Sequence, residues 1–352
     1  MSATIPESAM NTSQTIDMPL KPSDIVRYLD QYVIGQDEAK RVLAVAVYTH
    51  YRKLSLGKSG KMSLDKSNVL IVGPSGCGKT LLCETMARQL DVPFVTADAT
   101  SLAQTRYVGE EIVAIMTRLL ERADGRLEQA ARGIVFIDEV DKLKARGDAP
   151  RAVSGESVQH ALLKIMEGYP VHLGDGRTID TSGIMFICGG AFVGLEDIMA
   201  RSQSLGYITA SQDDDENILD RLNNRVKPTD LFEFGLIPEF TGRLPMVVRI
   251  QTLSKEMLIR IMVEPKNALY RQYQAILAQE GVQLAIAAPV FRQIAEIAQE
   301  YKTGARSLRG IFEELLTPVL FAVPDHPEIK RVEIHSLFDP PKYLTAGKQA
   351  EA

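Results

Sequence analysis

The chain has 352 residues, of which 45% are hydrophobic and 24% are charged, and its net charge is −5. This length exceeds the usual size of one domain, so two domains with separate cores are expected. The composition is typical of a soluble globular protein, and the acidic balance argues against a general nucleic-acid or anionic-membrane binder. No apolar run approaches the length needed to cross a membrane.

The start of the chain and the cysteines indicate the cellular setting. The first basic residue is Lys21, and the polar segment before it argues against a secretory signal or a mitochondrial presequence. Cys77, Cys83 and Cys188 are scattered, with no C-x-x-C pair, so neither a zinc site nor a disulfide framework is expected. We therefore predict a cytoplasmic protein that carries no zinc.

The first two thirds of the chain alternate between helical and strand-like patterns. Residues 1–20 lack periodic apolar positions and predict a disordered tail. A helical pattern runs from Pro22 to Leu54, interrupted by the segment YVIGQ at Tyr32–Gln36. Five apolar runs then predict strands: Asn68–Val72, Pro93–Ala97, Gly133–Ile137, Gly183–Cys188 and Pro245–Ile250. Such strands, separated by helices, predict an α/β fold with a parallel sheet covered on both faces.

The pattern changes after Leu253, where apolar residues fall at helical spacing. Two segments show it, at Leu269, Tyr273 and Ile276, and at Phe291, Ile294 and Ala298. A short strand at Arg331–Ile334 closes this part. We expect a large domain over residues 21–252, a smaller and mostly helical domain over residues 253–335, and a flexible tail over residues 336–352.

The first predicted strand runs directly into GPSGCGKT, which fits the pattern G-x-x-x-x-G-K-[ST]. Glycines in this pattern let backbone N–H groups wrap phosphates at a helix N-terminus. Lys79 would reach the β- and γ-phosphates, and the Thr80 hydroxyl would hold Mg²⁺. A chance glycine-rich turn does not account for the strand before it and the helical LLCETMARQL after it. The expected nucleotide contacts are Gly73, Pro74, Ser75, Gly76, Cys77, Gly78, Lys79, Thr80 and Leu81.

The apolar strand Ile134–Ile137 ends in Asp138 and Glu139. A carboxylate at the tip of a buried strand beside the phosphate loop can hold the Mg²⁺ shell, so Asp138 joins Thr80 as a predicted metal residue. Glu139 is placed to polarise a water for attack on the γ-phosphate. Asp138 alone could be a helix N-cap, but that does not explain two acids after so apolar a strand. The guanine-reading motif N-K-x-D is absent, so the expected nucleotide is ATP.

Several segments in chain order resemble the ClpX family, the AAA+ unfoldases of the Clp protease. They are YVIGQDEAK, GPSGCGKT, GIVFIDEVDK, FICGGAF, FGLIPEFTGRLP, EPKNAL and KTGARSLR, and they extend from about Lys21 to about Ile334. FGLIPEFTGRLP and KTGARSLR are the most specific. The resemblance implies an AAA+ ATPase domain, a small helical domain, and a homohexamer that binds ATP between subunits and threads polypeptide substrates through its pore.

The resemblance also implies roles for residues outside the phosphate loop. Val33 and Ile34 would line the adenine pocket, the alternative being a plain core pair. Arg243 corresponds to the arginine finger that reaches a neighbour's γ-phosphate, the alternative being a surface salt bridge. Arg306 corresponds to the sensor-2 arginine, the alternative being a solvent-facing residue at the start of a helix.

The segment QTRYVGEE, Gln104–Glu111, follows the second predicted strand, where the family carries its first pore loop. Tyr107 and Val108 would be the aromatic and aliphatic pair that grips the substrate. Arg106 stands where the family usually has glycine. The alternative is that Tyr107 packs on its own domain as a helix staple. A second pore loop would lie around Ser154–Glu156.

The chain also departs from the family pattern. The four-cysteine zinc module has no counterpart in this sequence, and the pore-entrance loop is reduced to Gly174–Thr178. The tripeptide that docks a ClpP-type peptidase is expected at Leu205, Gly206 and Tyr207, where tyrosine replaces phenylalanine and brings a hydroxyl into an apolar cleft. A remodelling ATPase without a peptidase is therefore the nearest alternative. A nucleic-acid motor on the same core would want a basic channel or an added DNA-binding module, and the sequence offers neither.

Overall fold

The computed structural model describes residues 20–58, 66, 68–104, 107–144, 155–205 and 225–345. The predictions for Arg106, Ser154, Gly206 and Tyr207 fall outside these residues. Within the described ranges, no helix combines the length and the apolar character required to cross a membrane.

The central element is a parallel five-stranded sheet, which confirms the predicted α/β class. Its strands lie in the order β2-β3-β6-β1-β7 and all pair in parallel. Each predicted strand is present, with slightly shifted bounds. The strands are β1 (Val69–Val72), β2 (Phe94–Asp98), β3 (Ile134–Asp138), β6 (Met185–Gly190) and β7 (Met246–Arg249).

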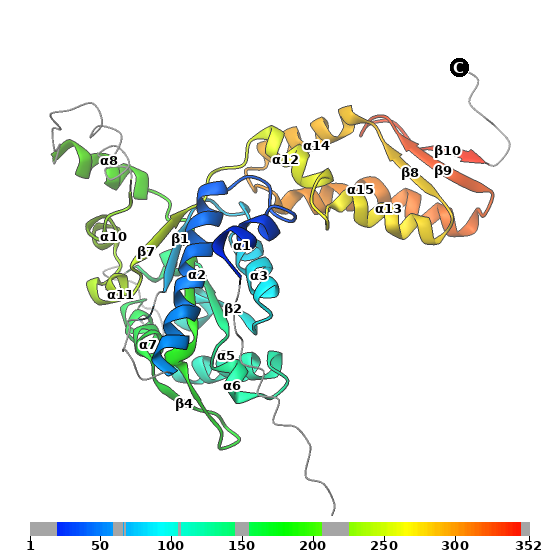
Figure 1. Cartoon of the computed structure of the whole chain (residues 1–352). Helices are drawn as coiled ribbons and strands as arrows, with labels where there is room; N and C mark the ends of the chain where they lie inside the picture. Colours follow the sequence, from blue (N-terminus) through cyan, green and yellow to red (C-terminus); the bar gives the residue numbers. More distant parts are fainter. Residues whose placement is uncertain are drawn as a thin grey trace, which may run out of the picture.

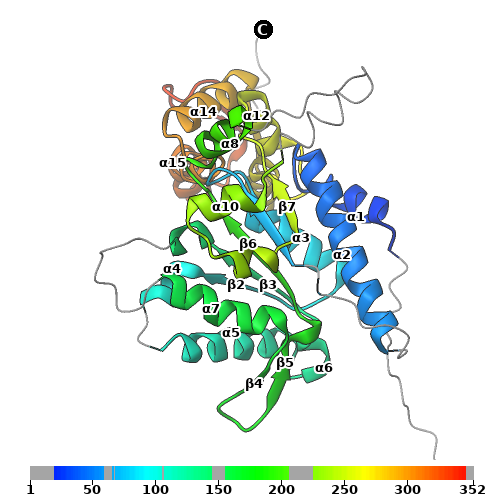
Figure 2. The ribbon, with the colours of Figure 1, turned by 90° about the vertical axis from the view of Figure 1, so that its left-hand side faces the viewer.

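Helices cover both faces of this sheet (Figures 1 and 2). Two helices, α1 (Pro22–Leu29) and α2 (Asp37–Lys58), precede the sheet and lie on the same side of it in Figure 2. The others between the strands are α3 (Lys79–Leu90), α4 (Ala99–Gln104), α5 (Val108–Arg122), α6 (Leu127–Ala130), η1 (Val140–Leu143), α7 (Gly155–Glu167), η2 (Thr181–Gly183), α8 (Leu195–Leu205), α10 (Pro228–Phe234) and α11 (Pro238–Gly242).

Two hydrophobic clusters, one on each face, explain why the strands are apolar at nearly every position. Successive side chains of a strand point to opposite faces. In β3, Ile134 and Phe136 belong to the cluster that includes α1, α2 and α3. Val135 and Ile137 belong to the other cluster, with α5, α7 and α10. Both faces of the three inner strands, β3, β6 and β1, are therefore removed from water, whereas the edge strands β2 and β7 keep exposed polar residues such as Thr96 and Arg249.

The expected pore-entrance segment is the turn of a small antiparallel hairpin, β4 (Pro170–His172) and β5 (Thr178–Asp180). The Leu173 N–H donates to the Arg177 carbonyl at 2.8 Å, and the Arg177 guanidinium pairs with the Asp175 carboxylate. Residues 174–178 are thus held by local bonds rather than forming a long loop. The hairpin projects at the lower edge of the sheet in Figure 1.

The C-terminal part is mostly helical, as predicted, and also contains a three-stranded sheet. β8 pairs in parallel with β9, and β10 pairs antiparallel with β9. Figure 1 shows this part extending from one side of the five-stranded sheet. Its elements are α12 (Lys255–Val263), α13 (Leu269–Gln279), β8 (Gln283–Ile286), α14 (Ala288–Glu300), α15 (Arg306–Ala322), η3 (Val323–Asp325), β9 (Ile329–Ile334) and β10 (Lys342–Thr345).

Residues 337–345 are more ordered than the flexible tail predicted for them from the sequence. The Leu337 N–H donates to the Gln293 side chain at 3.0 Å, and β10 then satisfies the outer edge of β9. An uncovered strand edge presents unpaired N–H and C=O groups, and β10 pairs with them. Residues 337–345 are therefore part of the folded C-terminal part.

One buried cluster runs from the sheet into the C-terminal part. Val248 and Ile250 lie in the same cluster as Leu258 and Met262 of α12, together with core residues of α13 to α15. Because packing continues across residue 253, the division into domains at 252/253 stays a prediction.

His50 on α2 is a buried titratable group whose environment makes the folding stability fall at acid pH. Its side chain is 2% exposed, and Nε2 donates to the Gly183 carbonyl at 3.1 Å. Burial lowers the pKa of His50 from 6.5 to about 4, and nearby Lys66 acts in the same direction. As pH falls, the unfolded chain binds this proton before the folded chain does. The stabilisation is therefore complete above pH 6.5 and is lost progressively as pH falls to about 4.

We predict that His50→Gln reduces the loss of folding stability between pH 6.5 and about pH 4, because glutamine can donate to the Gly183 carbonyl but does not titrate. In the unmodified chain, the free energy of unfolding should fall by at most about 3 kcal/mol, because each pH unit between the two pKa values contributes about 1.4 kcal/mol. Thermal unfolding midpoints from pH 4 to pH 7 measure it. His335→Gln, on the surface, is the matched control and should keep the original slope. The same slope in His50→Gln would show that other groups cause the acid loss.

Candidate nucleotide site

The phosphate loop leaves the sheet between β1 and α3. The Gly73 N–H donates to the Gly190 carbonyl at 3.1 Å, which ties the start of the loop to the end of β6. Gly76 and Gly78 have φ of 77° and 92°, a region that glycine adopts without steric cost. α3 begins directly afterwards at Lys79. The loop thus delivers the first N–H groups of a helix to one position, which is the geometry that binds phosphate.

Lys79, the predicted phosphate-binding lysine, is buried against the phosphate loop. Its Nζ donates to the carbonyls of Gly73 and Pro74 at 2.7 and 2.9 Å. Burial lowers its pKa, while the Asp138 carboxylate acts in the opposite sense and Arg306 lowers it further. The structure therefore brings Lys79, Asp138 and Arg306 together, although they come from three separate segments.

The two acids lie where β3 ends. Asp138 Oδ1 accepts a hydrogen bond from the Glu139 N–H at 2.9 Å. Glu139 has φ of 61°, a left-handed conformation that costs a non-glycine residue on the order of 1 kcal/mol. Glu139, not Asp138, is the N-cap of η1, and it forms no side-chain cap. The strained turn places two consecutive carboxylates at the carboxyl edge of the sheet, beside the phosphate loop.

The donor chemistry of the site fits Mg²⁺. This ion prefers oxygen ligands and is usually held by one or two carboxylates together with phosphate oxygens. Asp138 supplies a carboxylate beside Lys79, and Thr80 supplies a hydroxyl in the first turn of α3. A Cβ at Gly189 of β6 would overlap the Phe136 ring at 2.6 Å, while Asp138 Oδ1 would stand at an ordinary contact distance of 3.5 Å.

Asp141 is a structural partner of the site that no sequence pattern singled out. It is buried, and its two carboxylate oxygens accept hydrogen bonds from the N–H groups of Ala191 and Phe192, both at 3.3 Å. A Cβ at Gly190 would lie 2.6 Å from Asp141 Oδ1. These contacts join the segment after β3 to the end of β6. The signal available in the sequence was a third acid in DEVD, two residues after Glu139.

The start of α15 packs directly on the phosphate loop. The Ala305 N–H donates to the Gly76 carbonyl at 3.0 Å, and a Cβ at Gly304 would lie 2.8 Å from that same carbonyl oxygen. Gly304 has φ of 61°. The contact is main chain on main chain, and it brings Arg306, the first residue of α15, close enough for its charge to lower the pKa of Lys79.

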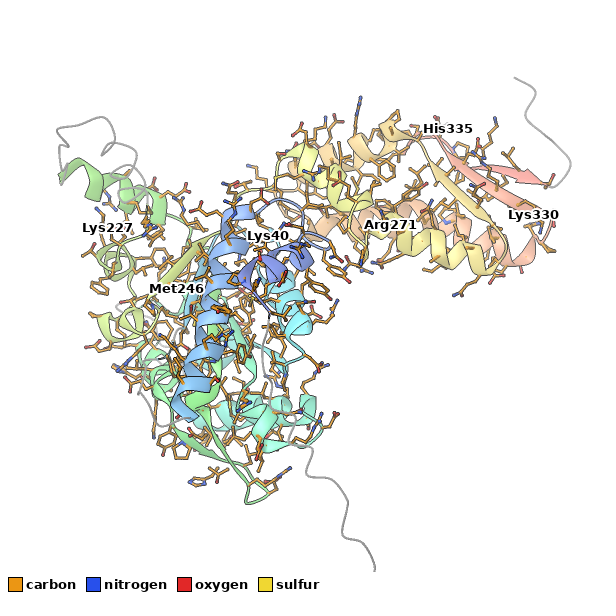
Figure 3. All side chains as sticks on the ribbon, viewed as in Figure 1. Lys40, Lys227, Met246, Arg271, Lys330 and His335 are labelled. Carbon is orange, nitrogen blue, oxygen red and sulfur yellow. The ribbon has the colours of Figure 1, made fainter. Side chains whose placement is uncertain are left out.

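Val33 and Ile34 are both buried and line a cavity of about 650 Å³. The rest of its lining comes from α1, α2, α12 and neighbouring loop residues rather than from the phosphate loop. Val33 also belongs to the main hydrophobic cluster. Lys40, labelled in Figure 3, lies on this cavity with its Nζ 2.7 Å from Asp30 Oδ1. Both proposed settings, core and pocket, therefore apply to Val33, and a contact with adenine stays a prediction.

Arg243 does not lie near the phosphate loop of its own chain. Its carbonyl accepts from Asn68, which precedes β1, whereas the phosphate loop follows β1. The four residues of β1 separate the two ends by about 13 Å. The guanidinium instead pairs with Glu167, with Nε and Nη2 at 2.9 and 2.7 Å from Oε1. No local motif pointed to Glu167.

The predicted pore-loop pair is divided between solvent and core. Tyr107 precedes α5 and is 66% exposed, whereas Val108 is half-buried and packs against the second cluster. The expected docking tripeptide begins at Leu205, the last residue of α8, and continues beyond the described residues.

The three cysteines are free and buried. Burial raises the pKa of the Cys77, Cys83 and Cys188 thiols, that of Cys188 to about 12. Among the described residues, no group of three or more His, Cys, Asp or Glu side chains is arranged to hold a metal.

A phosphate loop after β1, paired acids after β3 and an arginine-bearing helical part docked on that loop define a P-loop ATPase of the AAA type. Two family models match the chain: the AAA domain (Cdc48 subfamily) over residues 64–247, and the C-terminal, D2-small domain of ClpB protein over residues 253–334.

Curated relatives give a narrower assignment. The ATP-dependent Clp protease ATP-binding subunit ClpX 3 of Methylococcus capsulatus is 44% identical over 340 residues, which is 88% of this chain and 78% of that protein. The corresponding ClpX subunit of Porphyromonas gingivalis is 43% identical over 334 residues, covering 89% of this chain and 80% of that protein. The chain belongs to the ClpX family of AAA ATPases, and it hydrolyses ATP.

We predict that Gly304→Ala weakens ATP binding about tenfold, because a left-handed alanine costs about 1–2 kcal/mol and its Cβ meets the Gly76 main chain. Displacing this contact moves Arg306 away from the phosphate loop. Titration with a fluorescent ATP analogue measures the effect.

The matched control is Gly310→Ala in α15, where a Cβ meets nothing within 4 Å. This variant should bind the analogue normally. Equal affinities for the two variants would show that docking of α15 on the loop does not contribute to binding.

Proposed function

We propose that this chain is an ATP-dependent protein unfoldase and translocase that acts as a homohexamer and delivers polypeptide substrates to a ClpP-type peptidase. The observation that carries the threading step is Tyr107, a large aromatic side chain 66% exposed at the end of the segment that follows α4. Tyr107 stands directly before α5, in the segment where the ClpX family carries a pore loop, and an exposed aromatic side chain at that place is available to contact a polypeptide.

The position of Arg243 supports the proposal of a hexameric ring. At the amino end of β1 it lies away from its own phosphate loop, and an arginine that stabilises the γ-phosphate is supplied in trans in many NTPases. In a hexamer each Arg243 would serve the neighbouring subunit, exchanging its contact with Glu167 for the nucleotide. Both partners of that ion pair are about half exposed, so the exchange costs little.

Hydrolysis follows from the residues around the phosphate loop. Lys79 and Arg306 supply positive charge for the phosphates of ATP, and Glu139 orients the attacking water as general base. Asp138 and Thr80 would hold Mg²⁺, which when bound neutralises charge on the β- and γ-phosphates. Val33 and Ile34 would contact the adenine. Residues 73–81 form the backbone cradle.

Threading requires a contact that is independent of substrate sequence. A tyrosine facing the axial channel pushes on a polypeptide by steric and apolar contact, so it needs no particular partner residue. Val108 packs on the second cluster and thereby anchors the base of the loop. Leu205, the last residue of α8, would contact the peptidase together with Gly206 and Tyr207, which follow it in the sequence. A cytoplasmic location and the absence of zinc, nucleic-acid and membrane partners stay predictions.

The second candidate function is a remodelling ATPase that works without a peptidase. It is favoured by one observation in the sequence, the tyrosine at position 207, whose hydroxyl would have to enter an apolar cleft. Unfolding without degradation in the assay below would support this function instead.

The proposed function predicts that the chain, ATP and a ClpP-type peptidase together degrade a tagged, folded fluorescent protein. Glu139→Gln is the matched control, since it keeps Lys79, Asp138 and the phosphate loop but lacks the base. It should bind ATP and hydrolyse it about 10²–10⁴-fold more slowly. Fluorescence loss, peptide release and phosphate release are measured in parallel. Near-normal turnover in Glu139→Gln would show that another group is the base.

We further predict that Tyr107→Ala uncouples ATP hydrolysis from unfolding. The side chain is exposed, so its removal opens no core void and touches no phosphate. Unfolding of a stable client should fall much more than translocation of an unfolded one, because only the former requires force. Phe338→Ala, at an aromatic of the C-terminal part that is 81% exposed, is the control and should unfold clients normally. A stability loss of about 3 kcal/mol with a parallel fall in ATPase rate would instead indicate a packed helix staple.

A further inference from the structure

Gln36 forms a reciprocal pair of hydrogen bonds with a residue 215 positions away in the chain. Its Nε2 donates to the Gln251 carbonyl at 2.8 Å, and its Oε1 accepts from the Gln251 N–H at 2.9 Å. Gln36 is only 5% exposed. A primary amide can bind the main-chain N–H and C=O of one residue in this way because it carries a donor and an acceptor side by side.

Residue 251 lies in the short connection between β7 and α12, where the five-stranded sheet gives way to the C-terminal part. Its neighbour Ile250 donates its N–H to the Val72 carbonyl at 2.8 Å. The Ile250 carbonyl oxygen lies 2.5 Å from the position that a Cβ of Gly73 would take. Residue 251, which Gln36 binds, therefore directly follows the residue that packs on Gly73, the first residue of the phosphate loop.

On its other side, Gln36 continues the segment that contains Val33 and Ile34. Gly35 precedes it, and the Met257 side chain of α12 closes on Gly35 so tightly that a Cβ there would overlap the thioether methyl. Gly35 and Gln36 have φ of 65° and 59°. Glutamine seldom adopts this conformation, so the surrounding contacts must hold it there. The Gln36 carbonyl accepts from the Lys40 N–H at 2.9 Å, and the amide pair with Gln251 adds the side-chain contact.

We propose that Gln36 is a positioning residue for ATP binding, which locks the connection between β7 and α12 to the segment 33–36 and so holds Arg306 over the phosphate loop. Two of the contacts around that loop involve the C-terminal part and the connection that leads to it: the Ala305 N–H donates to the Gly76 carbonyl, and the Ile250 N–H donates to the carbonyl of Val72, the residue before the loop. Gln36 fixes the second contact and thereby restricts the orientation in which the first can form. This proposal rests on the ATPase activity but not on substrate threading.

The amide is the feature that matters. Gln36→Glu keeps the size of the side chain but turns an acceptor toward the Gln251 carbonyl, so the two oxygens repel. Gln36→Met keeps the length and the neutrality of the side chain but leaves the main-chain N–H and C=O of Gln251 without their partner. The matched control is Gln251→Ala, which retains both hydrogen bonds because they use main-chain atoms, and the Gln251 side chain is exposed.

The test measures ATP affinity, KM and kcat for the full chain, with amide hydrogen exchange over residues 249–254 in the presence and absence of ADP. No client or peptidase is added, so failure of the threading proposal leaves this test intact. We expect Gln36→Glu to raise KM about tenfold, the loss expected from buried hydrogen bonds, with a smaller change in kcat. Exchange over residues 249–254 should accelerate, and ADP should no longer slow it. Gln251→Ala should behave as the unmodified chain.

Two results would overturn the proposal. One is an unchanged KM and unchanged exchange in Gln36→Glu. The other is a lower melting temperature with normal affinity in the folded fraction, which would make Gln36 a residue of stability alone. If Gln36→Glu does not fold, the same measurements on Gln36→Met decide between these outcomes.

Discussion

Main chain packed directly on main chain around the phosphate loop is the constraint on which the rest of the structure depends. The Ile250 carbonyl lies where a side chain at position 73 would be, and Gly304 touches Gly76. Glycine is the residue that permits such approaches. The end of β1, the connection to α12 and the start of α15 therefore meet at one loop, and a displacement of any of them reaches the phosphates directly.

The parts of the fold that were predictable from the sequence are those encoded locally. A strand buried on both faces must be apolar at successive positions, so β1, β3 and β6 were evident as uninterrupted runs. The phosphate loop was equally evident, because its glycines and its lysine must be adjacent in sequence to surround a phosphate. The acids after β3 belong to the same class, since the end of a strand fixes their place.

Contacts between distant residues were beyond the reach of sequence patterns. The pairing of Glu167 with Arg243 spans 76 positions, and both residues read alone as ordinary surface charges. β10 becomes a strand because the edge of β9 is available to it. From the sequence alone, the two prolines directly before β10 suggested a loose tail. The exposure of Tyr107 and the partial burial of Val108 were likewise set by tertiary packing, although the two residues are neighbours.

The buried cysteines have a practical consequence for the chemistry of the chain. Thiols react as thiolates, and burial holds the pKa of all three native cysteines above the usual range. A cysteine introduced at an exposed position would therefore be the fast-reacting thiol in an otherwise unmodified chain. Dyes or spin labels can then report the angle between the sheet and the C-terminal part during turnover, with Cys77 left intact in the phosphate loop.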